Sequence, residues 1–130
     1  NKEGDMVAGE KILLIDDEQP IRKMFRLILS RAGYDIYEAD GCLKGVEVLR
    51  EEADISTVIL DVVMPGVTGI DCLAKIKAEF GEIPVIMVTG VTNMETTKEV
   101  LKMGAFDYIA KPVRKNDLLN IVGKALGKAD

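Results

Sequence analysis

Short apolar runs alternate with helix-period segments along almost the whole chain, and this alternation constrains the fold more than any other feature. Apolar runs predict strands at residues 11–15, 35–39, 57–60, 84–88 and 107–110. Apolar residues spaced three or four apart predict helices at residues 20–32, 42–50, 69–80, 94–103 and 115–126. We expect Met24 and Leu43 to face inward in the first two helices, and Thr68 to cap the third. Because strands alternate with helices, we expect a parallel sheet that is covered on both faces.

The simplest arrangement of these elements is a flavodoxin-like (βα)5 fold of the α/β class. It is a doubly wound sandwich with parallel strand order 2-1-3-4-5, and right-handed crossovers leave few other topologies. In this order the first and third strands are neighbours, at the point where open α/β sheets bind ligands. We expect this domain at residues 11–126, with 1–10 as an N-terminal extension or expression remnant and 127–130 as a C-terminal tail.

Composition narrows the functional classes. The net charge of −5 does not suggest a nucleic-acid surface, and no apolar run approaches the roughly 20 residues that span a bilayer. We therefore expect a cytoplasmic protein with no membrane partner. The chain contains no histidine, which excludes histidine acid–base chemistry and an internal phosphohistidine. Two cysteines make no disulfide framework, so we expect Cys42 and Cys72 to be packing thiols in a reducing compartment.

Three acidic residues directly follow strands of the predicted sheet. Asp61 ends an apolar strand and leads into Met64-Pro65-Gly66, and Asp16 and Asp17 follow the first strand. Because these strands are neighbours, we expect the three carboxylates to converge, and each like-charged pair at ~4 Å costs about 4 kcal/mol at an effective dielectric near 20. Such a cluster favours a bound cation. Hard oxygen ligands without histidine or cysteine favour Mg²⁺, with Mn²⁺ as a second choice.

Two further residues occupy the ends of the fourth and fifth strands. Thr89 offers a hydroxyl and Lys111 a mobile ammonium group, which suits an anion with several oxygens. An aspartate, a divalent ion, a hydroxyl and an ammonium group together favour attack of the carboxylate on phosphorus. The expected product is an aspartyl phosphate.

With these residues in place, residues 11–126 closely resemble the receiver domain of two-component response regulators. The shared motifs are Asp16-Asp17, Asp61 with Met64-Pro65 and Gly69, Thr89-Gly90, and Gly104-Ala105-Phe106-Asp107-Tyr108-Ile109-Ala110-Lys111-Pro112. The resemblance implies that Asp61 is the phosphoacceptor. It also implies Mg²⁺ bound by Asp17, Asp61 and the backbone carbonyl of Val63, with Asp16 acting largely through water.

The same resemblance implies partners and a switch. A histidine kinase or a histidine phosphotransfer domain would supply the phosphoryl group, which Lys111 would hold. Thr89 and Tyr108 would change conformation, and the bond before Pro112 would be cis. The signal would pass to an output domain or target protein, and the fourth helix, fifth strand and fifth helix could form a homodimer face. Such a domain is a signalling phosphoacceptor that catalyses only its own phosphotransfer and dephosphorylation, not an enzyme.

Two apolar positions and one helix refine this interpretation. Val63 and Val91 are apolar where many relatives carry polar groups, so we expect neither to orient an attacking water and the acyl phosphate to be long-lived. The helix at 94–103 has few apolar residues, which predicts low local stability. We expect this helix and Tyr108 to respond to phosphorylation.

Three other functions remain as alternatives. A phosphohydrolase with an aspartyl nucleophile would need a second acid at the position of Val63. A flavin-binding module would need a phosphate loop rich in serine, threonine or glycine after the first strand, where the chain instead has Asp16-Asp17-Glu18. A degenerate receiver that acts only as a docking module would not need the acid pair, Asp61, Thr89 and Lys111, which are all present.

Overall fold

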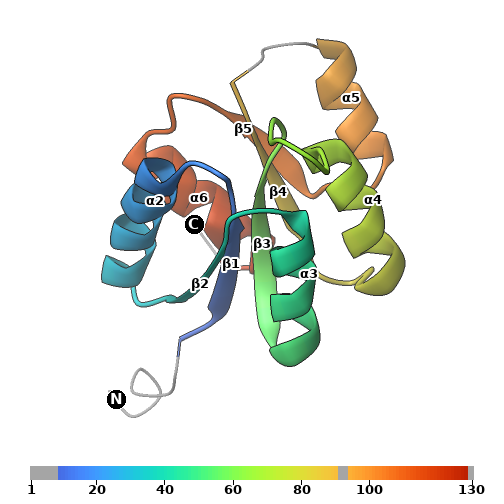
Figure 1. Cartoon of the computed structure of the whole chain (residues 1–130). Helices are drawn as coiled ribbons and strands as arrows, with labels where there is room; N and C mark the ends of the chain where they lie inside the picture. The colour runs from blue at the N-terminus through green and yellow to red at the C-terminus, as the bar shows by residue number, and fades with distance from the viewer. Residues whose placement is uncertain (1–8, 91–93, 129–130) are drawn as a thin grey trace.

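The computed structural model describes residues 9–90 and 94–128, and strands and helices alternate throughout them (Figure 1). In chain order the elements are β1 (Lys11–Ile15), α2 (Gln19–Arg31), β2 (Asp35–Ala39), α3 (Cys42–Glu51), β3 (Ile55–Asp61), α4 (Gly69–Glu79), β4 (Val85–Thr89), α5 (Met94–Lys102), β5 (Asp107–Ala110) and α6 (Lys115–Ala125). The predicted (βα)5 class is therefore confirmed. Most boundaries lie within two residues of those predicted.

The strands form one parallel sheet in the order β2-β1-β3-β4-β5, as predicted. β1 and β3 are neighbours, with Ile15 opposite Leu60 in the register, so Asp16 and Asp61 follow paired positions. Helices α3, α4 and α5 pack against one face of the sheet, and α2 and α6 pack against the other (Figure 1). The inner strands are continuous apolar runs because both of their faces are buried.

The helices bury a slightly different face from the one predicted. In α2 the buried residues are Phe25 and Leu29, while Met24, which was expected to face inward, is 39% exposed. In α3 the expected core residue Leu43 is 70% exposed, and Cys42 is buried instead. In α6 Ile121 joins the core. The apolar spacing allows more than one set of residues in each helix to face the sheet, and the tilt of the helix on the sheet determines which set is buried.

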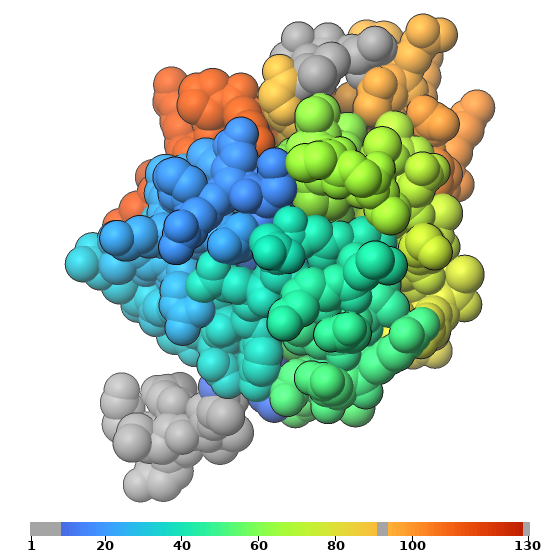
Figure 2. All heavy atoms as spheres, viewed as in Figure 1, coloured from blue at the N-terminus to red at the C-terminus, as the bar shows by residue number. Residues whose placement is uncertain are grey.

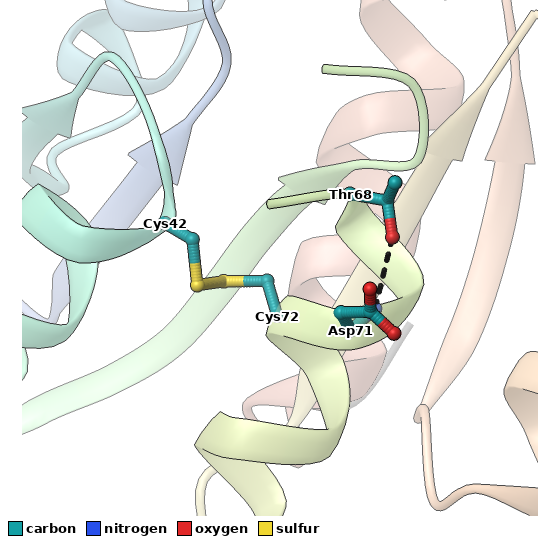
Figure 3. Close-up of a disulfide and its surroundings, with 4 residues drawn as sticks. All are labelled: Cys42, Thr68, Asp71 and Cys72. Carbon is teal, nitrogen blue, oxygen red and sulfur yellow. Dashed lines mark hydrogen bonds between the residues drawn. A yellow bond between two sulfur atoms is a disulfide. The ribbon is translucent and has the colours of Figure 1, made fainter. Parts of the chain in front are cut away.

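The prediction that the two cysteines are separate thiols was wrong. Cys42 and Cys72 form a disulfide between the start of α3 and the first turn of α4 (Figure 3). The two residues are 30 positions apart in sequence, yet their Cα atoms are 5.6 Å apart. The reason is topological: both helices cover the same face of the sheet, and both begin at its carboxyl edge.

The predicted cap at Thr68 is present, because its hydroxyl accepts a hydrogen bond from the amide of Asp71 at 3.2 Å (Figure 3). Among the described residues, no helix combines the length and apolarity needed to cross a bilayer. Most of the expected N-terminal extension, part of the C-terminal tail, and Val91 lie outside the described residues.

Candidate functional site

The three strand-end carboxylates meet at the carboxyl edge of the sheet. Asp61 is the last residue of β3, and Asp16 and Asp17 follow β1 directly. One carboxylate oxygen of each lies within 4.8 Å of those of the other two. Asp61 is 3% exposed and Asp16 is 6% exposed, while Asp17 faces solvent. The predicted convergence is therefore confirmed, and the three carboxylates form an acidic pocket at this edge of the sheet.

Backbone hydrogen bonds fix the two buried carboxylates in place. The Asp16 amide donates to the carbonyl of Ala39 at 3.1 Å, which ties the end of β1 to the end of β2. One carboxylate oxygen of Asp16 accepts from the Glu18 amide at 2.8 Å, and one of Asp61 accepts from the Val63 amide at 3.3 Å. Each carboxylate thus keeps further oxygen lone pairs for a ligand.

Burial and mutual repulsion change the acidity of this pocket. Burial, with the nearby charge of Asp16, raises the pKa of Asp61 from 3.8 to about 6, although Lys111 opposes the shift. Burial likewise raises the pKa of Asp16. A cation at the three carboxylates would remove both penalties, since it compensates the desolvated charges. The all-oxygen donor set and the repulsion between its members therefore fit a Mg²⁺ or Mn²⁺ ion.

Lys111 places a positive charge beside Asp61. Its ammonium nitrogen lies 3.6 Å from a carboxylate oxygen of Asp61 and 3.9 Å from one of Glu18. The Lys111 amide donates to the carbonyl of Thr89 at 2.8 Å, which places the two residues side by side at the ends of β5 and β4. The peptide bond from Lys111 to Pro112 is cis, as the resemblance implies.

The expected switch residues differ in exposure. Thr89 is 4% exposed, whereas the Tyr108 side chain is 40% exposed and lies on β5 at the edge of the sheet. Val63 is 63% exposed beside Asp61. In α5, Val100 is the one residue that is buried among those described, which agrees with the low burial predicted for this helix.

Two charged neighbours of the site were not predicted. The carboxylate of Glu18 approaches Lys111, and the guanidinium of Arg22 donates to the backbone carbonyl of Asp16 at 2.6 Å. Arg22 is itself held by an ion pair with Glu38 at 3.0 Å. The sequence feature that could have indicated these two neighbours is their spacing, because Glu18 and Arg22 are one helical turn apart at the start of α2. It identifies a shared helix face but not what that face contacts.

The comparisons with known proteins agree with this geometry. The family model of the response regulator receiver domain matches residues 12–123. The chain is 35% identical to the chemotaxis protein CheY1 of Helicobacter pylori, over 92% of this chain and 99% of that protein. It is also 35% identical to the regulatory protein AtoC of Escherichia coli, over 93% of this chain and 26% of that protein.

Solved structures give the same result. A response regulator receiver domain protein from Clostridium thermocellum superposes with a TM-score of 0.86 at 33% identity, over 91% of this chain and 94% of that one. The fold and the carboxylates at the ends of β1 and β3 define a signalling module of the α/β class. The chain belongs to the response regulator receiver domain family. It spans only a quarter to a half of the length of several curated relatives, among them AtoC and the phosphate regulon regulator PhoB of Pseudomonas aeruginosa.

Proposed function

We propose that this domain accepts a phosphoryl group on Asp61 from the phosphohistidine of a histidine kinase or of a histidine phosphotransfer domain. The observation that carries the proposal is the pairing of a buried Asp61 carboxylate with the Lys111 ammonium at 3.6 Å, in a pocket that has two more carboxylates. Receiver domains are signalling modules in general, and this arrangement supports the same role here. We also propose that the domain works in the cytoplasm.

The transfer itself would be a single displacement at phosphorus. An oxygen of Asp61 attacks, an O–P bond forms, the P–N bond to histidine breaks, and the imidazole nitrogen keeps the electron pair. Lys111 and the hydroxyl of Thr89 would orient and neutralise the phosphoryl oxygens. Asp16, Asp17, Asp61 and the carbonyl of Val63 would hold Mg²⁺, or Mn²⁺ in its place. The ion would supply charge compensation for the carboxylates and the phosphoryl group.

The donor would approach over an apolar cleft beside Asp61. This cleft has a volume of about 400 Å³ and is lined by the α2 residues Ile21, Met24 and Phe25, and by Gly90, Lys111, Pro112 and Val113. Met24 is 39% exposed there, so apolar surface is available to a partner helix. We propose that the kinase or phosphotransfer domain contacts this cleft. Lys111 lines the cleft and also lies beside Asp61, so a histidine bound here would be close to the acceptor.

Signal output would use the surface formed by α5 and β5. Movement of Thr89 toward the phosphoryl oxygens would let the exposed ring of Tyr108 turn inward and bias α5, which buries little surface. Met94, Leu101 and Phe106 are also exposed on this side. We propose that an output domain, a target protein or a second copy of the chain binds here. No nucleic-acid contact is proposed for the domain itself.

The test is intact mass after incubation with acetyl phosphate, with and without Mg²⁺. We expect the parent to gain one phosphoryl group only with Mg²⁺, and Asp61→Asn to gain none. Asp117→Asn, which changes an exposed acid on α6, is the matched control and should react like the parent. No gain from acetyl phosphate, followed by no gain from a phosphohistidine protein, would leave a docking-only receiver and refute the proposal.

A further inference from the structure

The disulfide joins the starts of α3 and α4, at the same edge of the sheet as the acidic pocket. Cys42 is the first residue of α3, and Cys72 lies in the first turn of α4. Both residues are buried in the core on that face of the sheet, in the same cluster as Ile15 and Met64, which adjoin the acid pocket in sequence. The covalent loop that the bond closes contains the whole of β3 and therefore Asp61.

On one side the disulfide holds the segment that carries Asp61. The amide of Gly69, the first residue of α4, donates to the carbonyl of Val62 at 2.9 Å. A side chain at Gly69 would collide with the carbonyl of Asp61, so α4 begins in direct contact with the Asp61 backbone. Cys72 follows one turn later, and its amide donates to Thr68 at 2.9 Å. A shift of this first turn would therefore move the backbone of Asp61.

On the other side the disulfide holds the segment beside Asp16. Cys42 follows the end of β2, where the carbonyl of Ala39 accepts the Asp16 amide at 3.1 Å. The bond thus ties the strand end that contacts Asp16 to the helix start that contacts Asp61. Because the carboxylates repel one another, this covalent link between their segments would restrain the pocket from widening.

We propose that Cys42 and Cys72 form a reversible thiol–disulfide exchange site that controls how tightly the acidic pocket binds a divalent cation. This inference rests on the proposed function, which places the domain in the cytoplasm and assigns Mg²⁺ to the pocket. Cytoplasmic thiols are kept reduced, and the disulfides found there are mostly catalytic or redox-sensing. A disulfide next to a phosphoacceptor therefore indicates control of the receiver by the thiol redox state.

The exchange reaction needs a disulfide as its oxidant. This can be a small molecule such as oxidised glutathione, or a dithiol protein in its oxidised form. The two thiols of Cys42 and Cys72 lose two protons and two electrons as the S–S bond forms. The S–S bond of the oxidant breaks, and its two sulfurs take up those protons and electrons as thiols. Reduction of the pair by a dithiol is the reverse reaction.

Access to the buried sulfurs would come from separation of α3 and α4. A groove of about 590 Å³ runs between these helices, lined in part by Leu43, Val46 and Ala78. Their surfaces meet on the face of the molecule that Figure 2 presents. At the far end of the groove Arg50 makes paired hydrogen bonds to the two carboxylate oxygens of Glu79, at 2.7 and 2.8 Å. This exposed ion pair would have to break for the helices to separate there.

The experiment compares the oxidised and reduced forms of the full chain. Alkylation and intact mass define the redox state, calorimetric titration gives the Mg²⁺ affinity, and amide exchange reports on Gly69 and Cys72. The Phe80 amide, bonded to Ile76 at the other end of α4, is the internal control. We expect reduction to weaken Mg²⁺ binding by at least about threefold and to speed exchange at Gly69 and Cys72 but not at Phe80. Oxidised glutathione should restore both properties.

A double variant, Cys42→Ala with Cys72→Ala, should match the reduced parent in Mg²⁺ affinity and amide exchange. Adding reductant should change neither property of this variant. If this variant does not fold, the two forms of the parent still give the comparison. Equal Mg²⁺ affinity in both forms would overturn the proposal, as would exchange that rises equally at Phe80 or a disulfide that glutathione cannot re-form. Absence of phosphorylation in both forms would refute the proposed function alone, because the Mg²⁺ titration does not depend on it.

Discussion

Replacing Asp61 with asparagine should stabilise the fold at neutral pH without divalent ions, although it removes the proposed phosphoacceptor. Asp61 is 3% exposed, and burial together with the charge of Asp16 raises its pKa from 3.8 to about 6. At pH 7 the folded protein therefore carries a carboxylate that would be more stable in the unfolded chain. Asparagine has nearly the same shape and no charge to desolvate.

The size of the effect follows from linkage. A rise of roughly two pKa units at about 1.4 kcal/mol per unit corresponds to about 3 kcal/mol of destabilisation at pH 7. Because the folded pKa lies above the unfolded value, this destabilisation is absent below pH 3.8 and grows as the pH rises toward 6. At pH 5 it should be about half its full size. This shift already includes the attraction of Lys111, so we expect Asp61→Asn to gain about 1–3 kcal/mol at pH 7.5.

The assay is urea unfolding of the parent and Asp61→Asn at pH 7.5 and pH 5.0 with a chelator, both with the disulfide intact. The advantage of the variant should fall at the lower pH. Added Mg²⁺ should stabilise the parent more than the variant and so reduce the difference at pH 7.5. Asp117→Asn should show none of these effects. A variant no more stable than the parent at pH 7.5, or a difference independent of pH, would refute the reasoning.

Four further outcomes are expected. Val63→Asn should shorten the lifetime of the acyl phosphate about tenfold by orienting a water, and Val63→Leu should leave it unchanged; equal lifetimes in a phosphate-release assay would contradict this. Lys111→Ala should slow phosphorylation by acetyl phosphate about 100-fold while the far-ultraviolet circular dichroism stays the same. Amide exchange in α5 should change when a phosphoryl mimic binds, and Tyr108→Ala should reduce that change; unchanged exchange would remove α5 from the switch. Leu118→Ala should cost about 2–5 kcal/mol in urea unfolding because Leu118 is fully buried, and a smaller loss would show that the core can collapse around it.

Much of the fold followed from local patterns. Each strand was marked by an apolar run, and each helix by a different periodicity, so the order of elements and the parallel sheet could be predicted. The convergence of Asp16, Asp17 and Asp61 also followed, because it depends only on the adjacency of β1 and β3 and on the acids that end them. Chirality of the crossovers reduces the topologies to a few, which makes this step reliable.

The sequence did not determine how the helices sit on the sheet. The apolar spacing of α3 allows either Leu43 or Cys42 to face inward, and the contact with α4 selects Cys42. The contact of Arg22 with the Asp16 carbonyl depends in the same way on the rotation of α2.

The sequence by itself thus determined the strand order, the carboxylate cluster and the family resemblance, since these depend on residues next to each other in the chain or at paired strand ends. Only the tertiary structure decided that Cys42 and Cys72 are bonded and that the pocket raises the pKa of Asp61. Both depend on distances and burial between segments that are remote in sequence. Helix packing sets those distances, and no periodicity in the chain encodes them directly.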